Sequence, residues 1–343
     1  MKNRLLKILL AVVFCLISFA GLSACGGRKE TIYQINSDEK TCTITGWSGT
    51  VGKEFYIPEE FGGLPVTRIG EEAFKGFDFE KVIIPDSVMT ISEGAFTGCN
   101  SLKEINIPDS VITIDSEAFQ DCNSLESVVI GDGVKSIGAY AFYACSNLTS
   151  VVIGKNVWDI GEKAFFCIKL VEVINNSFYI KATKGDTYNG HLGYYAIAVY
   201  NRNDTFMGSK LSRDNGYVVY TDGEEKILVN YMGEETDLTL PAYLTKIHND
   251  AFYFCKDLTR VVISDGVKSI GDSAFSYCFG LQSVVIPKTV TKIEESAFAS
   301  CDSLTSFEFG GTVQQWYQIQ KDSTWKYKTP ATEITCSNGV AVL

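Results

Sequence analysis

The sequence predicts an α/β repeat solenoid that is mainly β, built from stacked turns of similar sequence. The heptapeptide DGVKSIG occurs twice, at residues 132–138 and 265–271, and the apolar positions around the two copies match. An Ala-Phe pair recurs eight times between Ala73-Phe74 and Ala297-Phe298, with spacings of 22, 23, 23, 23, 87, 23 and 23 residues. A fixed period in this range is typical of a solenoid, in which each turn buries its apolar face against its neighbours.

Each turn has the same internal layout. Leu102, Ile105 and Ile107 are spaced as in a strand with one buried face, and Pro108 then breaks that strand. The glycine and lysine of DGVKSIG raise the alternative of a phosphate-binding loop. That loop needs its glycine directly before the lysine, and a valine separates them in both copies. The repeat is therefore the better explanation.

Residues 1–24 have the layout of a secretory signal peptide. Three basic residues precede an apolar run over residues 8–20, which is too short for a comfortable membrane span. The run ends in Leu-Ser-Ala-Cys, which resembles the lipobox of bacterial lipoproteins and implies that Cys25 carries lipid at the mature N-terminus. The alternative is an ordinary signal followed by a chance cysteine. Residues 25–31 are then a lipid anchor and a short tether, which spans at most roughly 20 Å.

Two segments have the pattern of a cap that begins an array of turns. Residues 32–63 contain two strands around a polar turn, then a glycine and a strand that ends in proline. The insertion, residues 175–235, ends in the same pattern, with a hairpin predicted over Tyr217–Tyr220 and Lys226–Tyr231. We therefore expect a first stack of repeats over residues 64–174 and a second over residues 236–309.

Residues 310–343 are predicted to close the array. Thr312 and Gln315 form a capping-box pattern before a short helical stretch, and Asn338-Gly339 marks the turn of a hairpin. Caps are required because the open ends of a solenoid expose apolar surface and strand edges.

The charge balance excludes some classes of partner. Removal of the signal leaves 27 basic and 41 acidic residues, a net charge of −14. This argues against binding to nucleic acid and against adhesion to anionic lipid by charge alone. Contact with a membrane is expected only through the N-terminal lipid.

The cysteines follow the repeat and do not form a disulfide framework. Seven follow the Ala-Phe pair, at the place where the first repeat has Phe77. They are Cys99, Cys122, Cys145, Cys167, Cys255, Cys278 and Cys301. Thiols stacked in this way point in the same direction, so we expect free, buried side chains. Cys42 and Cys336 belong to opposite ends and should not pair. The chain has no C-x-x-C motif, and we predict no metal site and no cofactor.

The repeat reads L-x-x-V-x-I-P-x-x-V-x-x-I-G-x-x-A-F-x-x-C-x-x-L and resembles the leucine-rich repeat of the BspA-like type found in bacterial surface proteins. The match covers about residues 64–174 and 236–309. The resemblance implies an arc with a parallel sheet along one face. It also implies attachment to host or matrix proteins, or to neighbouring bacteria.

No catalytic motif accompanies the repeat. The two histidines are His191, in the insertion, and His248, at a polar repeat position where we expect a surface side chain. Neither stands in a nucleophile or metal motif. The sequence therefore predicts a protein that is not an enzyme.

A stripe along the predicted concave sheet is the first candidate binding surface. It consists of the residue between the two inward positions of each strand, and six of its nine members are β-branched aliphatics. The members are Ile83, Asn106, Val129, Val152, Ile174, Thr239, Val262, Val285 and Glu308. An apolar stripe with a polar rim is typical of a protein-recognition surface. Valine also suits any strand, so the pattern alone does not decide the matter.

The insertion holds the second candidate surface. Its tyrosines include Tyr188, Tyr194, Tyr195 and Tyr200, which could stack on sugars or pack the insertion onto the solenoid. We therefore predict a lipid-anchored, extracytoplasmic bacterial surface protein that binds another extracellular or cell-surface protein through its concave sheet. The alternative is a surface lipoprotein that captures carbohydrate with the tyrosine-rich insertion.

Overall fold

The computed structural model describes residues 31–49, 51–205 and 208–343. The predicted signal peptide, Cys25 and nearly all of the tether lie outside the described residues. None of the described helices has the length and apolar character that a membrane span needs.

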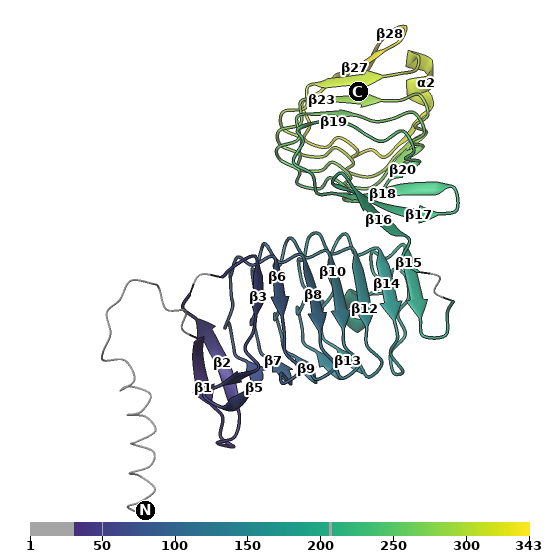
Figure 1. The fold of residues 1–343 in the computed structure, drawn as a ribbon. Coiled ribbons are helices and arrows are strands. Elements are labelled where there is room, and N and C mark those ends of the chain that lie inside the picture. The colour runs from purple at the N-terminus through teal and green to yellow at the C-terminus, as the bar shows by residue number, and fades with distance from the viewer. Residues whose placement is uncertain (1–30, 50, 206–207) are drawn as a thin grey trace, which may run out of the picture.

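The chain forms two stacks of turns, and each stack contains two mainly parallel sheets (Figure 1). In the first stack, the longer strands form one seven-stranded sheet. In spatial order these strands are β3 (Glu54–Tyr56), β6 (Lys81–Ile83), β8 (Glu104–Ile107), β10 (Ser127–Ile130), β12 (Ser150–Ile153), β14 (Glu172–Asn175) and β15 (Ala198–Asn201). We call this sheet the first long sheet.

The other sheet of the first stack begins with the N-terminal hairpin and continues through short strands. Its members are β1 (Thr31–Ile35), β2 (Cys42–Trp47), β5 (Leu64–Ile69), β7 (Thr90–Ile91), β9 (Thr113–Ile114), β11 (Ser136–Ile137) and β13 (Asp159–Ile160), with β4 (Glu60–Phe61) paired to β5. The repeat pattern predicts a single parallel sheet. A second sheet forms because the two residues at the end of the segment before each Ala-Phe pair also form a short strand. These short strands pair in parallel, in register, from one repeat to the next.

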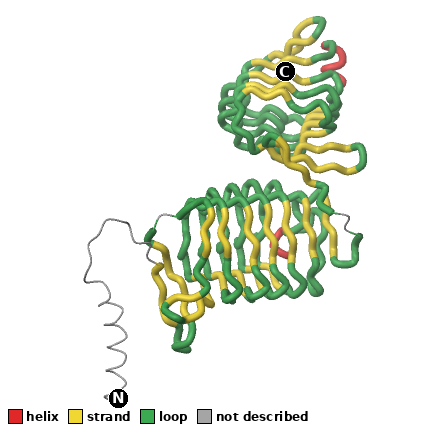
Figure 2. The backbone as a smooth tube through the Cα atoms, in the orientation of Figure 1, coloured by secondary structure: helices red, strands yellow, loops and turns green. Residues whose placement is uncertain are grey.

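The second stack repeats this arrangement. Its short-strand sheet consists of β16 (Leu211–Asp214), β17 (Tyr217–Asp222), β18 (Glu225–Tyr231), β20 (Lys246–Ile247), β22 (Ser269–Ile270), β24 (Lys292–Ile293) and β26 (Gln320–Lys321). Its long sheet, the second long sheet, consists of β19 (Asp237–Thr239), β21 (Arg260–Val262), β23 (Ser283–Ile286), β25 (Ser306–Phe309), β27 (Glu333–Cys336) and β28 (Gly339–Val342). Loops and turns make up the rest of each coil, apart from the short helices η1 (Asn189–His191) and α2 (Val313–Gln318) (Figure 2).

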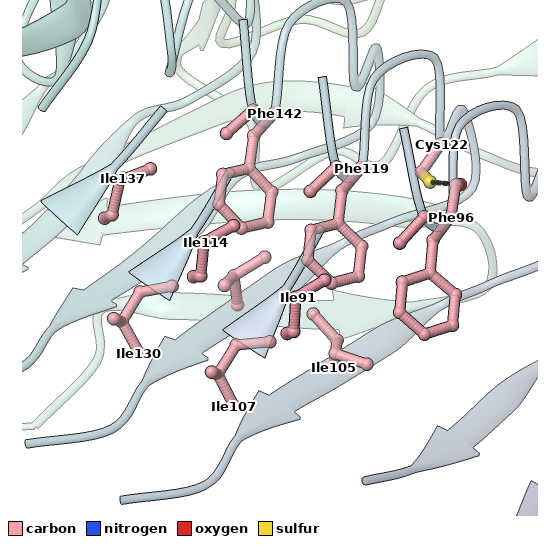
Figure 3. Close-up of a cluster of buried hydrophobic side chains, with 14 of the residues drawn as sticks. Ile91, Phe96, Ile105, Ile107, Ile114, Phe119, Cys122, Ile130, Ile137 and Phe142 are labelled. Atoms are coloured by element: carbon pink, nitrogen blue, oxygen red, sulfur yellow. Dashed lines mark hydrogen bonds between the residues drawn. The ribbon is translucent and has the colours of Figure 1, made fainter. Parts of the chain in front are cut away.

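Stacked phenylalanines form the centre of the core. Successive rings of the Ala-Phe pairs lie face to face, with centroids 5.0 Å apart for both Phe96–Phe119 and Phe119–Phe142 (Figure 3). The backbone holds this spacing, because the N–H of Phe119 donates to the carbonyl of Ala141 one turn later at 2.7 Å. The predicted ladder of like residues is therefore a ladder of ring stacks joined by hydrogen bonds between turns.

The repeat cysteines lie beside this ladder and are free, as predicted. The Sγ of Cys122 donates to the carbonyl of Phe96 at 3.2 Å, and the same bond recurs along the stack (Figure 3). All seven are buried except Cys255, which is partly exposed. Cys42 and Cys336 are also buried and unpaired with one another.

The capping box and the hairpin predicted near the C-terminus are confirmed. The hydroxyl of Thr312 accepts from the backbone N–H of Gln315, and the side chain of Gln315 accepts from the N–H of Thr312, which is a complete capping box for α2. Strands β27 and β28 form the predicted hairpin, with Ser337 and Asn338 between them. The buried rings of Trp316 and Trp325 cover the end of the core.

The hairpin β17–β18 begins the second stack and also joins it to the first. Its inner face, which includes Val219 and Leu228, packs into the core of the second stack. Its outer face, formed by Val218, Tyr220, Ile227 and Val229, packs on Val171 and Ala198 of the first stack. Apolar residues on both faces are typical of a strand that is buried on both sides.

The N-terminal hairpin β1–β2 occupies the equivalent place in the first stack. Ladder pairing aligns Ile44 with Leu228, because each pairs with the isoleucine that precedes the first Ala-Phe turn of its stack. The outer positions of β18 held by Ile227 and Val229 then correspond to Thr43 and Thr45. This face of the N-terminal hairpin is therefore more polar than the corresponding face of β17–β18.

Candidate interaction surfaces

The first long sheet places one outward-facing side chain of each strand in a continuous row. In β8 the residues alternate between exposed and buried, so that Asn106 points away from the core. Strand register then sets Asn106 beside Val129, Val129 beside Val152, and Val152 beside Ile174. We call this set, together with Ile83, the first row.

The first row is open to solvent at its centre. Val129 is 43% exposed and Asn106 is exposed, whereas Ile83, Val152 and Ile174 are half-buried. The row also extends beyond its predicted ends, because Tyr56 pairs with Ile83 and Tyr200 pairs with Ile174. Tyr56 is 63% exposed. Its segment, FYIP, matches the V-x-I-P part of the repeat, and this is the signal that could have identified it.

Val262 and Val285 lie on a different surface. They belong to the second long sheet, where the outward row runs through Thr239, Val262, Val285 and Glu308. Both valines are half-buried, and their row has polar residues at its neighbouring positions. The structure therefore divides the predicted stripe into two rows on separate sheets.

Charged residues line the edge of the first long sheet where the strands begin, and most of them are paired. Glu80 bridges Lys103 and Lys53, with N–O distances of 2.8 Å to each, and the hydrogen bonds from these lysines lower the pKa of Glu80 to about 2. Lys81 lies between Glu54 and Glu104. This edge therefore presents alternating charges that largely neutralise one another.

The opposite edge of the first row is acidic. Asp86, Asp109 and Asp132 follow three successive long strands. Asp132 pairs with Lys155, whereas Asp86 and Asp109 have no ion-pair partner among the described residues. A depression of about 390 Å³ lies between the two edges and is lined by residues that include Lys81, Ile83, Asp86, Asn106 and Val129. The first row thus combines an apolar floor with one neutralised edge and one acidic edge.

The insertion does not gather its tyrosines into one site. Tyr200 lies in β15, at the end of the first row. Tyr194 and Tyr195 contact each other edge to face, with centroids 4.7 Å apart, and both pack near Phe166 of the last repeat. Tyr188 is 77% exposed. Two of the four rings therefore pack on the solenoid, one extends its sheet, and one projects into solvent.

The prediction that His248 is a surface side chain is wrong. His248 is half-buried, since it follows β20 directly beside the hairpin β17–β18, and its N–H donates to the carbonyl of Leu228. Burial, together with the charge of Lys246, lowers its pKa to about 4. His191 packs against the rings of Phe166 and Tyr194.

The described residues hold no group of three or more His, Cys, Asp and Glu side chains arranged to bind a metal ion. The buried thiols are poorly suited to nucleophilic chemistry, because burial raises the pKa of Cys301 to about 12 and that of Cys278 well above its usual range.

Comparisons with known proteins agree with the repeat pattern. The family model of the BspA type leucine rich repeat region matches residues 67–184 and 230–340 in six copies. No curated protein is similar to the chain.

Three solved structures illustrate the range of similar chains. A leucine rich cell surface protein from Faecalibacterium prausnitzii is 22% identical, with coverage of 89% of this chain and 99% of that one and a TM-score of 0.30. The T. pallidum leucine rich repeat protein is 20% identical, with coverage of 88% and 96% and a TM-score of 0.39. The pneumococcal vaccine antigen PcpA is 16% identical, with coverage of 92% and 89% and a TM-score of 0.37. These scores are too low to establish a common arrangement of whole chains. The family match, which spans most of the chain, is sufficient by itself: this protein belongs to the BspA-type leucine-rich-repeat family.

Proposed function

We propose that this chain is a lipid-anchored bacterial surface protein, not an enzyme, that binds another extracellular protein through the first row. The observation that carries the proposal is the exposed centre of that row. The described part of the insertion leaves it open, since Arg213 of β16 reaches only the sheet edge, where it pairs with Glu126 at 2.8 Å and donates to Thr149. Val129 remains 43% exposed.

The charges around the row indicate the chemistry of the partner. The neutralised edge offers little net attraction, whereas Asp86 and Asp109 favour basic groups. A protein that presents apolar side chains flanked by lysine or arginine fits this surface. Such binding should weaken as salt rises, because exposed charges are screened within about 8 Å at physiological ionic strength.

A matched pair of double variants tests the row. Val129→Lys with Val152→Lys alters the first row, and Val262→Lys with Val285→Lys makes the same change on the second long sheet. Matrix proteins and bacterial-surface proteins would be screened against the immobilised chain, and each identified partner would be measured against both variants. Loss of binding in the first variant alone supports the proposal. Equal binding by both folded variants contradicts it.

Membrane attachment needs its own test. Cys25→Ser should abolish incorporation of a labelled fatty acid and move the protein from the membrane fraction to the soluble fraction. If the variant stays on the membrane, the lipid anchor is wrong and the N-terminal segment holds the protein in another way.

Carbohydrate capture remains the second candidate function. The exposed rings of Tyr188 and Tyr194 favour it, because exposed aromatic faces can stack on sugars. Glycan-array binding that is lost in Tyr188→Ala and Tyr194→Ala would support this function over protein binding.

A further inference from the structure

Two polar side chains meet inside the joint between the stacks. Lys169, in the last regular turn of the first stack, is 5% exposed, and Asn230, in β18, is fully buried. The Nζ of Lys169 donates to Oδ1 of Asn230 at 2.5 Å. The Nδ2 of Asn230 donates to Oδ1 of Asn147 at 3.0 Å.

Both residues depart from the pattern at their positions. Lys169 stands two residues after Cys167. At the corresponding place, two residues after Phe77, Cys99, Cys122 or Cys145, the four preceding turns have Phe79, Ser101, Ser124 and Asn147. Asn230 stands two residues after Leu228, where the N-terminal hairpin has Gly46 two residues after Ile44. Lys169 is therefore not accounted for by the repeat pattern, and Asn230 is not accounted for by the pattern of the N-terminal hairpin.

A charged lysine is poorly satisfied in this joint. No ion pair involves Lys169 among the described residues, and burial lowers the pKa of its ammonium group. The carboxyl group of Asp250, from the second stack, acts in the opposite direction when it is ionised. Burial favours the neutral amine, which has a free lone pair and lies against a side-chain amide.

We propose that Lys169 and Asn230 form an isopeptide bond that joins the two stacks covalently. The distance is suitable. Because Nζ lies 2.5 Å from Oδ1 and a carbonyl bond measures about 1.23 Å, Nζ is within about 3.7 Å of the amide carbon Cγ. This is close to the separation of reacting atoms in a near-attack arrangement.

The reaction balances without an oxidant, a reductant or a further reactant. The lone pair of neutral Nζ forms the Nζ–Cγ bond while the carbonyl electrons move onto Oδ1. When the carbonyl forms again, the Cγ–Nδ2 bond breaks. The leaving nitrogen takes one proton from Nζ and departs as ammonia. Asn147, which holds Nδ2, is only half-buried, so ammonia can leave toward solvent.

In this reaction Asp250, whose charge acts on Lys169, carries the proton. The residue next to it, Ala251, accepts a hydrogen bond from the N–H of Tyr231, directly after Asn230. Burial, with a contribution from the charge of Asp272, raises the pKa of Asp250 to about 7, so near neutral pH the group is present in both protonation states. The groups that feel its charge are Lys169, Tyr195 and Tyr253. A group with such a pKa is suited to both accepting and donating a proton.

The bond would link residues 61 positions apart and hold the stacks together after the chain unfolds. The test is the intact mass of the purified full chain, together with a peptide map after proteolysis. We expect a mass deficit of one ammonia molecule relative to Lys169→Met and to Asn230→Ala, each corrected for its own composition. We also expect a branched peptide that contains residues 169 and 230. A wild-type chain with its full mass, and with both residues in separate linear peptides after prolonged incubation, overturns the proposal. This outcome is measured on the wild-type chain, so it does not depend on whether any variant folds.

The role of Asp250 is tested by the rate at which the linked species appears after refolding. Asp250→Asn keeps the size of the side chain and suits the left-handed backbone at this position, where φ is 56°. It should slow bond formation by about 100-fold or more, the scale of general acid–base assistance. Asp250→Glu should recover part of the rate, whereas Asp272→Asn, the matched control, should retain most of it. An unchanged rate in Asp250→Asn removes Asp250 from the reaction.

Discussion

Truncation of one ring in the phenylalanine ladder should weaken the first stack strongly. Phe119 is fully buried, and its ring lies 5.0 Å from those of Phe96 and Phe142, with interplanar angles of 6° and 3°. Phe119→Ala removes a large buried side chain and leaves a cavity, for which the typical cost is about 4 kcal/mol. Two ring–ring contacts account for roughly 1 kcal/mol each of that loss. Phe119→Leu, which keeps most of the apolar volume, should therefore cost about 2 kcal/mol.

Phe254→Ala is the matched control. It makes the same substitution in the other stack, at a ring that is 54% exposed. We expect it to cost less than about 1 kcal/mol, because little area is withdrawn from the core.

Urea unfolding followed by circular dichroism measures these free energies, and peptide-level hydrogen exchange shows where they act. Because the turns of a solenoid contact only their neighbours, Phe119→Ala should increase exchange in β8, β10 and β12 and leave β21 and β23 nearly unchanged. Equal losses for Phe119→Ala and Phe254→Ala would refute the assignment of stability to the buried ladder. Equal losses for Phe119→Ala and Phe119→Leu would show that the ring contacts, and not the buried volume, govern the effect.

Three further predictions concern backbone packing, pH and thiols. Gly154→Ala should lower the free energy of unfolding in urea by at least about 2 kcal/mol, because a Cβ there would lie 2.2 Å from the carbonyl oxygen of Gly131. Gly52→Ala should be nearly neutral, because the atom nearest to a Cβ at that position is 3.6 Å away. His248 has its pKa lowered to about 4, so the unfolded chain binds a proton that the folded chain does not, and stability falls as the pH drops from about 6.5 to 4. This change in the free energy of unfolding amounts to about 3 kcal/mol across the range. The His248→Gln variant should lack it, so parallel pH profiles of unfolding for the variant and the wild type would contradict the prediction. A thiol reagent should label Cys255 first among the described cysteines of the native protein, since the others are buried, and early labelling of Cys122 or Cys145 would show that the stack opens locally.

The sequence by itself determines the repeating part of this fold. The 23-residue period places like residues one turn apart, so the Ala-Phe ladder, the buried thiols and the alternation in each long strand all follow from contacts between neighbouring turns. The caps could be predicted for the same local reason, since a capping box and a hairpin are specified within a few residues. The first row was also predictable from the period, and Tyr56 could have been added from the FYIP segment.

Tertiary structure alone decides what depends on the joint between the stacks. The division of the predicted stripe between two sheets, the place of Tyr200 in β15 and the partial burial of His248 result from how the insertion packs, and no period encodes that packing. The apolar residues on both faces of β17–β18 indicate that something covers the hairpin, but they do not identify the covering surface. The meeting of Lys169 and Asn230 is the extreme case, because two residues 61 positions apart become neighbours only when one stack docks on the other.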